Sequence, residues 1–352
     1  MFPENKRNRS FAAEWDKQDG VIIAWPHAGT DWAYMLDDVT ACYVEISHAI
    51  LNDADERLVI VAPDASEVHD VLGDSVDWQR IDIVELPTND TWVRDYGPIA
   101  VWRDGRAVLT DFTFNAWGMK FAADCDNLVT SRLNERGLFS MPLLNCRDLV
   151  LEGGSIETDG NGAVMTTTCC LTAPNRNDAL ERGQLERILL ERLGCIKMLW
   201  LDHGELAGDD TDGHIDTLAR FAPGGIILYT GCDDPADEHF ESLMSMENQL
   251  KQFTDTDGNH YHLIKLPLPD AIHDEISRLP ATYANFLVTN HQVLIPLYGQ
   301  PEKDIEACRL IGEAFPGRKV TGIDCRPLIC QHGSLHCGTM QLPAGSLTTN
   351  QH

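Results

Sequence analysis

The stretches VIIAW at residues 21–25 and RLVIVA at residues 57–62 are apolar runs of the length of a β-strand. Between them, Thr30 or Asp31 can cap a helix that continues through Leu51. A strand, a helix and a second strand in this order predict a βαβ unit. This unit decides the fold class, because the same order recurs along the rest of the chain.

The alternation of strand and helix patterns continues to the carboxyl end. Runs typical of strands lie at residues 81–86, 106–114, 163–168, 197–201, 225–230, 260–266, 293–297 and 319–323. Helix patterns lie at residues 64–72, 124–136, 178–193, 301–314, and from 233 or 234 to 253. No convincing linker separates them. The sequence therefore predicts an α/β fold of repeated units in a single domain over residues 1–352.

Composition and charge exclude several classes of partner. The 352 residues include 55 acidic and 27 basic ones, which gives a formal net charge of −28. So acidic a chain is not expected to bind nucleic acid, whereas a small cation is a compatible ligand. Residues 1–9 are charged and lack an apolar core, and no segment approaches the roughly 20 apolar residues of a membrane-spanning helix. We expect no membrane insertion and a cytoplasmic location.

The eleven cysteines are scattered and contain no C-x-x-C pair. This pattern favours reduced thiols, and the cysteine and histidine spacings do not match a zinc site, so no metal or other cofactor is expected. Cys337 follows His336 and lies between Gly333 and Gly338, which allow the backbone to bend around a substrate. Its local sequence leaves two interpretations open: a nucleophile, or a buried small hydrophobic residue.

Three stretches place an acid or an imidazole beside glycine, as expected where loops bring polar groups into a cleft: residues 88–98, 151–155 and 212–216. Asp95 and Asp216 can hold a planar cation such as a guanidinium from opposite edges. His214 can protonate a departing ammonia and then deprotonate water, and Glu152 can fix the tautomer of that imidazole. Each of these residues alone also fits a structural role, as a loop salt bridge, a turn acid or a core histidine.

Seven motifs follow one another in the order of a known family: Ala13–Trp15 with Ala24–His27, Trp92–Pro98, Phe114–Gly118, Leu151–Ser155, Pro174–Asn177, Gly213–Asp216 and Leu335–Cys337. Together they resemble the agmatine deiminase family. That family is also called the bacterial-type peptidylarginine deiminase family and belongs to the guanidine-modifying superfamily. The resemblance runs from about Glu14 to Pro343 and covers nearly the whole chain.

The resemblance implies a fold and a mechanism. The fold is the pentein fold, a five-bladed, pseudo-symmetric α/β propeller of ββαβ units. The implied activity is a metal-free hydrolysis in which Cys337 attacks the guanidinium carbon, ammonia leaves, and a covalent thiouronium adduct is hydrolysed to a ureido product. Asp95 and Asp216 would then grip the guanidinium, His214 would be the general acid and base, and Glu152 would support the site. The resemblance also implies that Trp92 lines the pocket and that the protein is a homodimer.

Agmatine is the expected substrate, with N-carbamoylputrescine as the product, in the biosynthesis of putrescine and polyamines. The acidic balance suits its terminal ammonium, whereas the carboxylate of arginine would require a basic partner. The alternative is a deiminase for free arginine or for peptides with a C-terminal arginine. Where relatives have glycines and an asparagine before the final histidine and cysteine, this chain has Gln331, His332, Gly333, Ser334 and Leu335. This departure concerns the pocket entrance more than the chemistry.

Three other functions are compatible with parts of the pattern. An amidinotransferase would resolve the same adduct with an amine in place of water. A binding protein would keep the cationic pocket without turnover, although it has no need of the thiol. A metal-dependent agmatine ureohydrolase would release urea, but the sequence lacks the aspartate and histidine pairs of a two-metal site.

Overall fold

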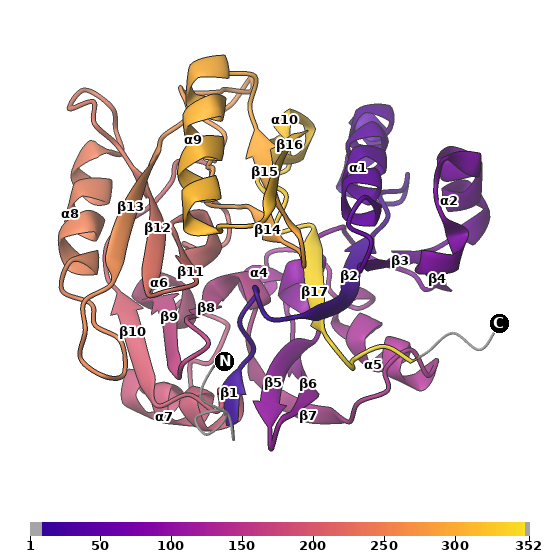
Figure 1. The fold of residues 1–352 in the computed structure, drawn as a ribbon, viewed down its shortest axis with the longest axis horizontal. Helices are drawn as coiled ribbons and strands as arrows, with labels where there is room; N and C mark the ends of the chain where they lie inside the picture. The colour runs from indigo at the N-terminus through magenta and orange to yellow at the C-terminus, as the bar shows by residue number, and fades with distance from the viewer. Residues whose placement is uncertain (1–8, 349–352) are drawn as a thin grey trace.

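The computed structural model describes residues 9–348, which form five sheets of three or four strands (Figure 1). In each sheet a first strand pairs antiparallel with a second, and the second runs parallel to a third. A helix joins the second strand to the third. The sheets lie around a common centre in Figure 1. This arrangement confirms the α/β fold class and the expected ββαβ unit.

Four units follow one another along the chain. The first is β5 (Ile99–Arg103), β6 (Arg106–Thr113), α5 (Val129–Glu135) and β7 (Leu143–Val150), with β1 (Arg9–Phe11) added beside β5. The second is β8 (Ile156–Thr158), β9 (Ala163–Thr167), α7 (Arg182–Leu193) and β10 (Lys197–Leu201). The third is β11 (Ala219–Ala222), β12 (Ile226–Gly231), α8 (Phe240–Leu250) and β13 (His262–Pro267). The fourth is β14 (Leu287–Val288), β15 (Gln292–Leu297), α9 (Pro301–Ala314) and β16 (Lys319–Asp324).

The fifth unit joins the two ends of the chain. It consists of β17 (Thr339–Pro343), β2 (Gln18–Ala24), α1 (Leu36–Leu51) and β3 (Arg57–Ala62), and is extended by α2 (Ala65–Leu72) and β4 (Ile81–Glu85). Thr339 of β17 lies opposite Ile23 of β2 in an antiparallel pair. Figure 1 shows this yellow strand beside the indigo one. The strand that follows Cys337 is thereby fixed to the amino-terminal part of the fold.

Apolar patterning explains the best-predicted elements. β2 and β3 are buried along almost their whole length, which is typical of strands covered on both faces. In α1 the buried side chains include Val39, Cys42, Tyr43, Ile46 and Ile50, which follow the three- and four-residue spacing of one helix face. The Thr30 side chain accepts a hydrogen bond from Trp32 N at 3.3 Å and caps the helical turn that precedes α1.

Several helices begin later than the sequence predicts, among them α5, which begins at Val129 and not at Asp124. α8 begins at Phe240 and not at Asp233 or Asp234, because the Asp234 carboxylate accepts a hydrogen bond from a backbone N–H two residues later and forms a turn. α7 begins at Arg182, where Glu181 forms a capping box with the helix. The strands β5, β7, β8, β11, β14 and β17 have no counterpart in the sequence prediction.

The residues just before the first strand of each unit meet one another. We call them the central segments: residues 92–98, 152–155, 213–218, 283–286 and 333–338. Gly154 N donates a hydrogen bond to Oδ1 of Asp95 at 2.9 Å, and Arg94 N donates to the backbone oxygen of Cys337 at 3.1 Å. The central segments bring together residues that lie far apart in the sequence.

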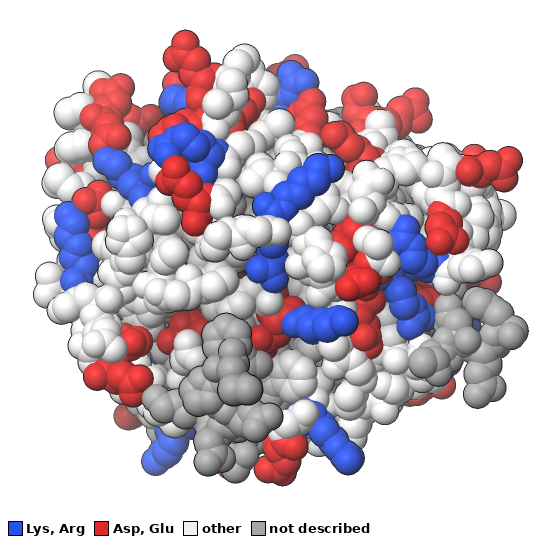
Figure 2. All heavy atoms as spheres, viewed as in Figure 1, with Lys and Arg blue, Asp and Glu red and all other residues white. Residues whose placement is uncertain are grey.

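The surface agrees with the acidic composition. On the face in Figure 2, acidic side chains recur over α8, α9, α1 and α2, with basic side chains between them. Among residues 9–348, no helix is both long and apolar enough to cross a membrane. The prediction that the amino terminus lacks a secretion signal falls mainly on residues 1–8, which lie outside the described residues. All eleven cysteines are free thiols in the structure, as expected.

Candidate active site

A cavity opens onto three of the central segments. The cavity and its open mouth enclose about 510 Å³, and Asp95, His214 and Cys337 line its buried end. Trp92, which the resemblance assigns to the pocket, also lines it. Glu152 and Asp216 lie behind these residues, fully buried. The structure therefore brings all six predicted site residues into one place, and their chemical roles follow from the contacts below.

The Cys337 thiol is held between an amide and a carboxylate. Its Sγ lies 3.3 Å from Oδ1 of Asn285 and 3.8 Å from Oδ2 of Asp216. Only 9% of the residue is exposed. Burial, and then the negative charges of Asp216 and Asp95, raise the pKa of the thiol well above its ordinary value. The resting Cys337 is therefore a protonated thiol at neutral pH.

Asn285 is a site residue that sequence reasoning missed. Its Oδ1 also accepts hydrogen bonds from His336 N at 2.9 Å and from Cys337 N at 3.2 Å. The amide thus fixes the turn that carries the nucleophile. Asn285 lies just before β14, as Cys337 lies just before β17 and Asp216 just before β11. Asn285 could have been found from this shared position in the repeated units.

Asp216 and Asp95 present two carboxylates to the same space. Oδ2 of Asp216 pairs with His336 Nδ1 at 2.8 Å, whereas the buried Oδ1 has no hydrogen-bond partner among the described residues. Burial would raise the pKa of Asp216, but the contact with His336 lowers it. Burial raises the pKa of Asp95 to about 6, although His214 opposes that shift. Oδ1 of Asp216 is therefore a buried acceptor whose hydrogen-bonding capacity is unused among the described residues.

A strained turn holds the Asp95 carboxylate from its other side. Trp117 Nε1 donates a hydrogen bond to Oδ2 of Asp95 at 2.8 Å. Trp117 lies in α4 (Ala116–Met119), whose residues have positive φ, with 52° at Ala116, 55° at Trp117 and 69° at Met119. Left-handed backbone costs about 1–2 kcal/mol for each non-glycine residue. Such strain is typical of segments whose conformation serves a site.

His214 lies between two acids. Nδ1 is 3.6 Å from Oδ1 of Asp95, and Nε2 is 3.9 Å from Oε2 of Glu152. Burial alone would lower the pKa of His214. The Asp95 carboxylate, followed by Cys170 and Glu152, outweighs burial and raises that pKa well above its ordinary value. The imidazole is therefore protonated at neutral pH and can act as an acid.

Glu152 is part of a fully buried ion pair. Arg176 Nε lies 3.0 Å and 3.1 Å from the two carboxylate oxygens of Glu152, and both side chains are 0% exposed. Arg176 also pairs with Asp212 at 2.6 Å. Burial would raise the pKa of Glu152, but His214 and Arg176 lower it, so the carboxylate stays charged. Arg176 belongs to one of the sequence motifs, but the motif alone does not indicate that it pairs with Glu152.

Four carboxylates line the outer part of the cavity: Asp31, Asp90, Asp209 and Asp210. Among the described residues that line the cavity, none is an arginine or a lysine. Phe121 also lines it and is half exposed. The mouth therefore attracts cations, and its described lining residues offer a carboxylate neither an arginine nor a lysine.

The model of the Porphyromonas-type peptidyl-arginine deiminase family matches residues 10–343. The chain belongs to this family. Its members hydrolyse carbon–nitrogen bonds of guanidino groups, which confirms the expected class of enzyme. The five ββαβ units are the pentein fold that the resemblance implies.

Three relatives show the extent of the similarity. A protein of Porphyromonas gingivalis, provisionally named an arginine deiminase, is 50% identical, with a TM-score of 0.92 over 97% of this chain and 100% of that one. The agmatine deiminase of C. jejuni, solved with substrate bound, is 35% identical, with a TM-score of 0.88 over 95% of this chain and 96% of that one. A protein of Legionella pneumophila, provisionally named an agmatine deiminase, is 32% identical over 94% of both chains.

The departure of this deiminase from the family motif lies at the pocket mouth, as expected. His332 has a positive φ of 65°, and its Nδ1 lies 2.7 Å from the backbone oxygen of Gly208. Gly333 is packed so closely on Trp92 that an added Cβ would lie 2.3 Å from the indole ring. His332 and Gly333 therefore form part of the cavity wall, and His332 lies beside the segment that carries Asp209 and Asp210.

Two groups of side chains have donor atoms close enough to share a metal ion: Glu152 with Cys170 and His214, and Glu14 with Glu157 and His336. In both groups a buried arginine already pairs with the carboxylates, Arg176 in the first and Arg220 in the second. The positive charge of these arginines opposes a metal cation at either place.

Proposed function

We propose that the protein is an agmatine deiminase, which hydrolyses the guanidinium of agmatine to N-carbamoylputrescine and ammonia. The roles of its residues are part of the proposal. The guanidinium lies between Asp95 and the free Oδ1 of Asp216. Each carboxylate accepts N–H donors of the cation, so that its central carbon faces the thiol of Cys337.

Substrate charge activates the nucleophile. Asp216 and Asp95 raise the pKa of Cys337 when the pocket holds no cation. A guanidinium between them offsets this effect, and the thiol proton leaves to solvent more readily. The thiolate then forms a bond to the guanidinium carbon.

His214 carries the protons of the following steps. The imidazolium gives its proton to the nitrogen that departs as ammonia, which leaves a thiouronium bonded to Cys337. The neutral imidazole then takes a proton from water, and the resulting hydroxide attacks the same carbon. The carbon–sulfur bond breaks and releases the ureido product. Glu152 orients the ring and stabilises its charged form.

The choice of agmatine as substrate rests on the negative charge at the mouth of the cavity. Asp31, Asp90, Asp209 and Asp210 lie where the far end of a bound substrate would extend. The ammonium of agmatine is complementary to these acids, whereas the carboxylate of arginine would be repelled by them.

A substrate panel tests this proposal. Purified enzyme is offered agmatine, free arginine and a peptide with a C-terminal arginine, and ureido product, ammonia and urea are measured. We expect agmatine to have the highest kcat/KM, with ureido product and ammonia formed in equal amounts. A higher kcat/KM for an arginine compound would contradict the assignment, and urea would indicate a different reaction.

A second candidate is a deiminase for arginine or for peptides that end in arginine. The name of the 50% identical relative favours it. So does Lys120, which lies beside the mouth, where it pairs with Asp212 at 2.9 Å. Breaking that pair would free a cation for a substrate carboxylate.

Three further statements are proposals that rest on the sequence: the whole chain is one catalytic domain, it works as a homodimer, and its location is cytoplasmic. A small guanidinium compound is its proposed ligand.

A further inference from the structure

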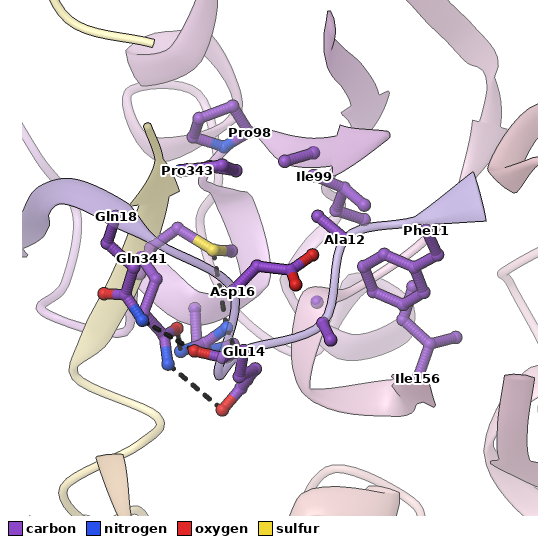
Figure 3. Close-up of a pocket in the computed structure, with 15 residues that line it drawn as sticks. Phe11, Ala12, Glu14, Asp16, Gln18, Pro98, Ile99, Ile156, Gln341 and Pro343 are labelled. Carbon is purple, nitrogen blue, oxygen red and sulfur yellow. Dashed lines mark hydrogen bonds and ion pairs between the residues drawn. The ribbon is translucent and has the colours of Figure 1, made fainter. Parts of the chain in front are cut away.

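A network of buried charges lies behind the proposed guanidinium site. Its hub is Glu14, from the segment between β1 and β2. The Glu14 carboxylate pairs with Arg94 Nη1 at 3.2 Å, accepts a hydrogen bond from Gln341 Nε2 at 3.0 Å, and pairs with Arg220. Figure 3 shows Glu14 pointing toward Gln341, at a second cavity that Glu14 and Gln341 both line. These partners belong to three different units of the fold.

Glu14 also reaches the proposed catalytic residues through one imidazole. His336 Nε2 lies 2.6 Å from Oε1 of Glu14, and His336 Nδ1 lies 2.8 Å from Oδ2 of Asp216. His336 is 1% exposed and Asp216 is fully buried. The ring therefore lies between the two carboxylates, and Arg220 Nη2 also lies 3.0 Å from Nε2.

The direction of the hydrogen bond to Asp216 is fixed by charge. Burial, followed by the charges of Arg220 and Arg94, lowers the pKa of His336, so the ring is neutral and carries one N–H. Contact with His336 keeps the pKa of Asp216 low, so Nδ1–H donates to the Asp216 carboxylate, and Nε2 accepts a hydrogen bond from Arg220 Nη2 at 3.0 Å. The other charged or titratable groups around Asp216 include Arg220, His214, Cys337, Asp95 and Arg94. None of these groups makes a hydrogen bond to Oδ1 of Asp216.

We infer that His336 and Glu14 are positioning residues. His336 anchors Asp216 through Oδ2, and Glu14 holds Arg220, which donates to Nε2 of His336, so that Oδ1 of Asp216 stays free for the guanidinium. The inference rests on the proposed function, because it assigns Asp216 to the guanidinium. It gives a role to two residues that contact neither the nucleophile's sulfur nor the cavity that holds the substrate.

The alternative is a network that only stabilises the fold. Two substitutions of His336 separate these roles. His336→Asn retains a donor near the place of Nδ1 but loses the contact with Glu14. His336→Leu removes both and keeps a side chain of comparable bulk. A stabilising role predicts similar defects for both, whereas a positioning role predicts that Asn restores function.

The test measures the affinity for the best substrate of the panel by calorimetry, in the Cys337→Ala background so that no turnover occurs. We expect His336→Leu to weaken binding by about tenfold to a hundredfold, the worth of a hydrogen bond to a charged group. We expect His336→Asn to bind within about threefold of the parent. Equal affinities for the Leu and Asn variants, at matched thermal midpoints, would overturn the inference.

A second experiment substitutes Glu14, and its result does not depend on whether the His336→Leu variant folds. Glu14→Gln, with Cys337 intact, is expected to raise KM by at least about threefold, because Arg220 loses its anionic partner and holds the ring of His336 less firmly. Asp16→Asn is the control from the same segment, since Asp16 accepts a hydrogen bond from Trp102 at 2.8 Å. Equal KM values for the two variants would count against the inference.

If the proposed function itself is wrong, the experiments give a different result. It would appear as a wild-type enzyme that forms no ureido product from any guanidine compound. The inference fails if the wild-type enzyme is active and the Leu and Asn variants of His336 bind substrate equally well, or if Glu14→Gln and Asp16→Asn have equal KM values.

Discussion

The Sγ of Cys337 lies 3.8 Å from Oδ2 of Asp216, so the proposed nucleophile rests beside a negative charge. Burial and this carboxylate raise the pKa of the thiol above its ordinary value of 9.0. The thiolate fraction at neutral pH is therefore smaller than that of an ordinary cysteine, and it grows as the pH rises.

This relationship predicts slow alkylation of the free enzyme at Cys337. With iodoacetamide at pH 7, we expect Cys337 to react more slowly than Cys169, which is exposed, and its rate to keep rising at alkaline pH. Peptide mass spectrometry measures both residues in one sample. Faster reaction at Cys337 than at Cys169 at pH 7 would show that the resting residue is a thiolate.

The hydrogen bond from Trp117 to Asp95 predicts a shift in the pH profile. The pKa of Asp95 is about 6, so kcat/KM should fall as the pH drops through 6 and the carboxylate becomes neutral. Trp117 lowers that pKa, so Trp117→Phe should move the acidic limb to higher pH. Phe121→Leu, at a neighbouring ring without a donor, serves as the control. An acidic limb that stays in place in Trp117→Phe would refute this assignment.

The buried pair of Arg176 and Glu152 predicts a large effect on stability. Arg176→Met leaves the Glu152 carboxylate without its cation, and we expect a loss of about 3–5 kcal/mol in the free energy of unfolding. Urea denaturation measures this change. Arg309 on α9 is exposed and pairs with Glu306, so Arg309→Met should change stability by less than about 1 kcal/mol. Similar values for the two variants would contradict the account of the ion pair.

Close packing at Gly333 predicts a steric effect on activity. In Gly333→Ala the new methyl group would lie against the Trp92 ring and displace it, so we expect kcat/KM to fall by about tenfold or more. Gly183, in the first turn of α7, has nothing within 4 Å of an added Cβ, and Gly183→Ala should leave activity unchanged. A fully active Gly333→Ala variant would mean that Trp92 does not shape the site.

The sequence predicts most of the parallel strands and long helices well, because their apolar patterns are long enough to recognise; β7, which runs parallel to β6, is the exception among the third strands of the units. α9 has the bounds that the pattern predicts. The first strand of each unit could not be seen in this way. β8 has three residues and β14 has two, too few to show alternation, and pairing across the unit stabilises them.

Some residues of the candidate site could likewise be predicted from the sequence, and others could not. Cys337 and His214 stand in motifs whose residue types indicate their chemistry. Asn285 was missed because asparagine is common in turns, and its place in the repeat is visible only once β14 is known. Arg176 and Glu14 lie in motifs as well, but their partners Glu152 and His336 are 24 and 322 positions away, so their roles depend on the fold.

Steady-state formation of ureido product by the Cys337→Ala variant tests the central claim most directly. The wild-type enzyme, assayed with agmatine at the same concentration, should form ureido product and ammonia in equal amounts. The variant should form neither above background, because no covalent adduct can be made. A Cys337→Ala variant that retains the wild-type rate would contradict the covalent mechanism.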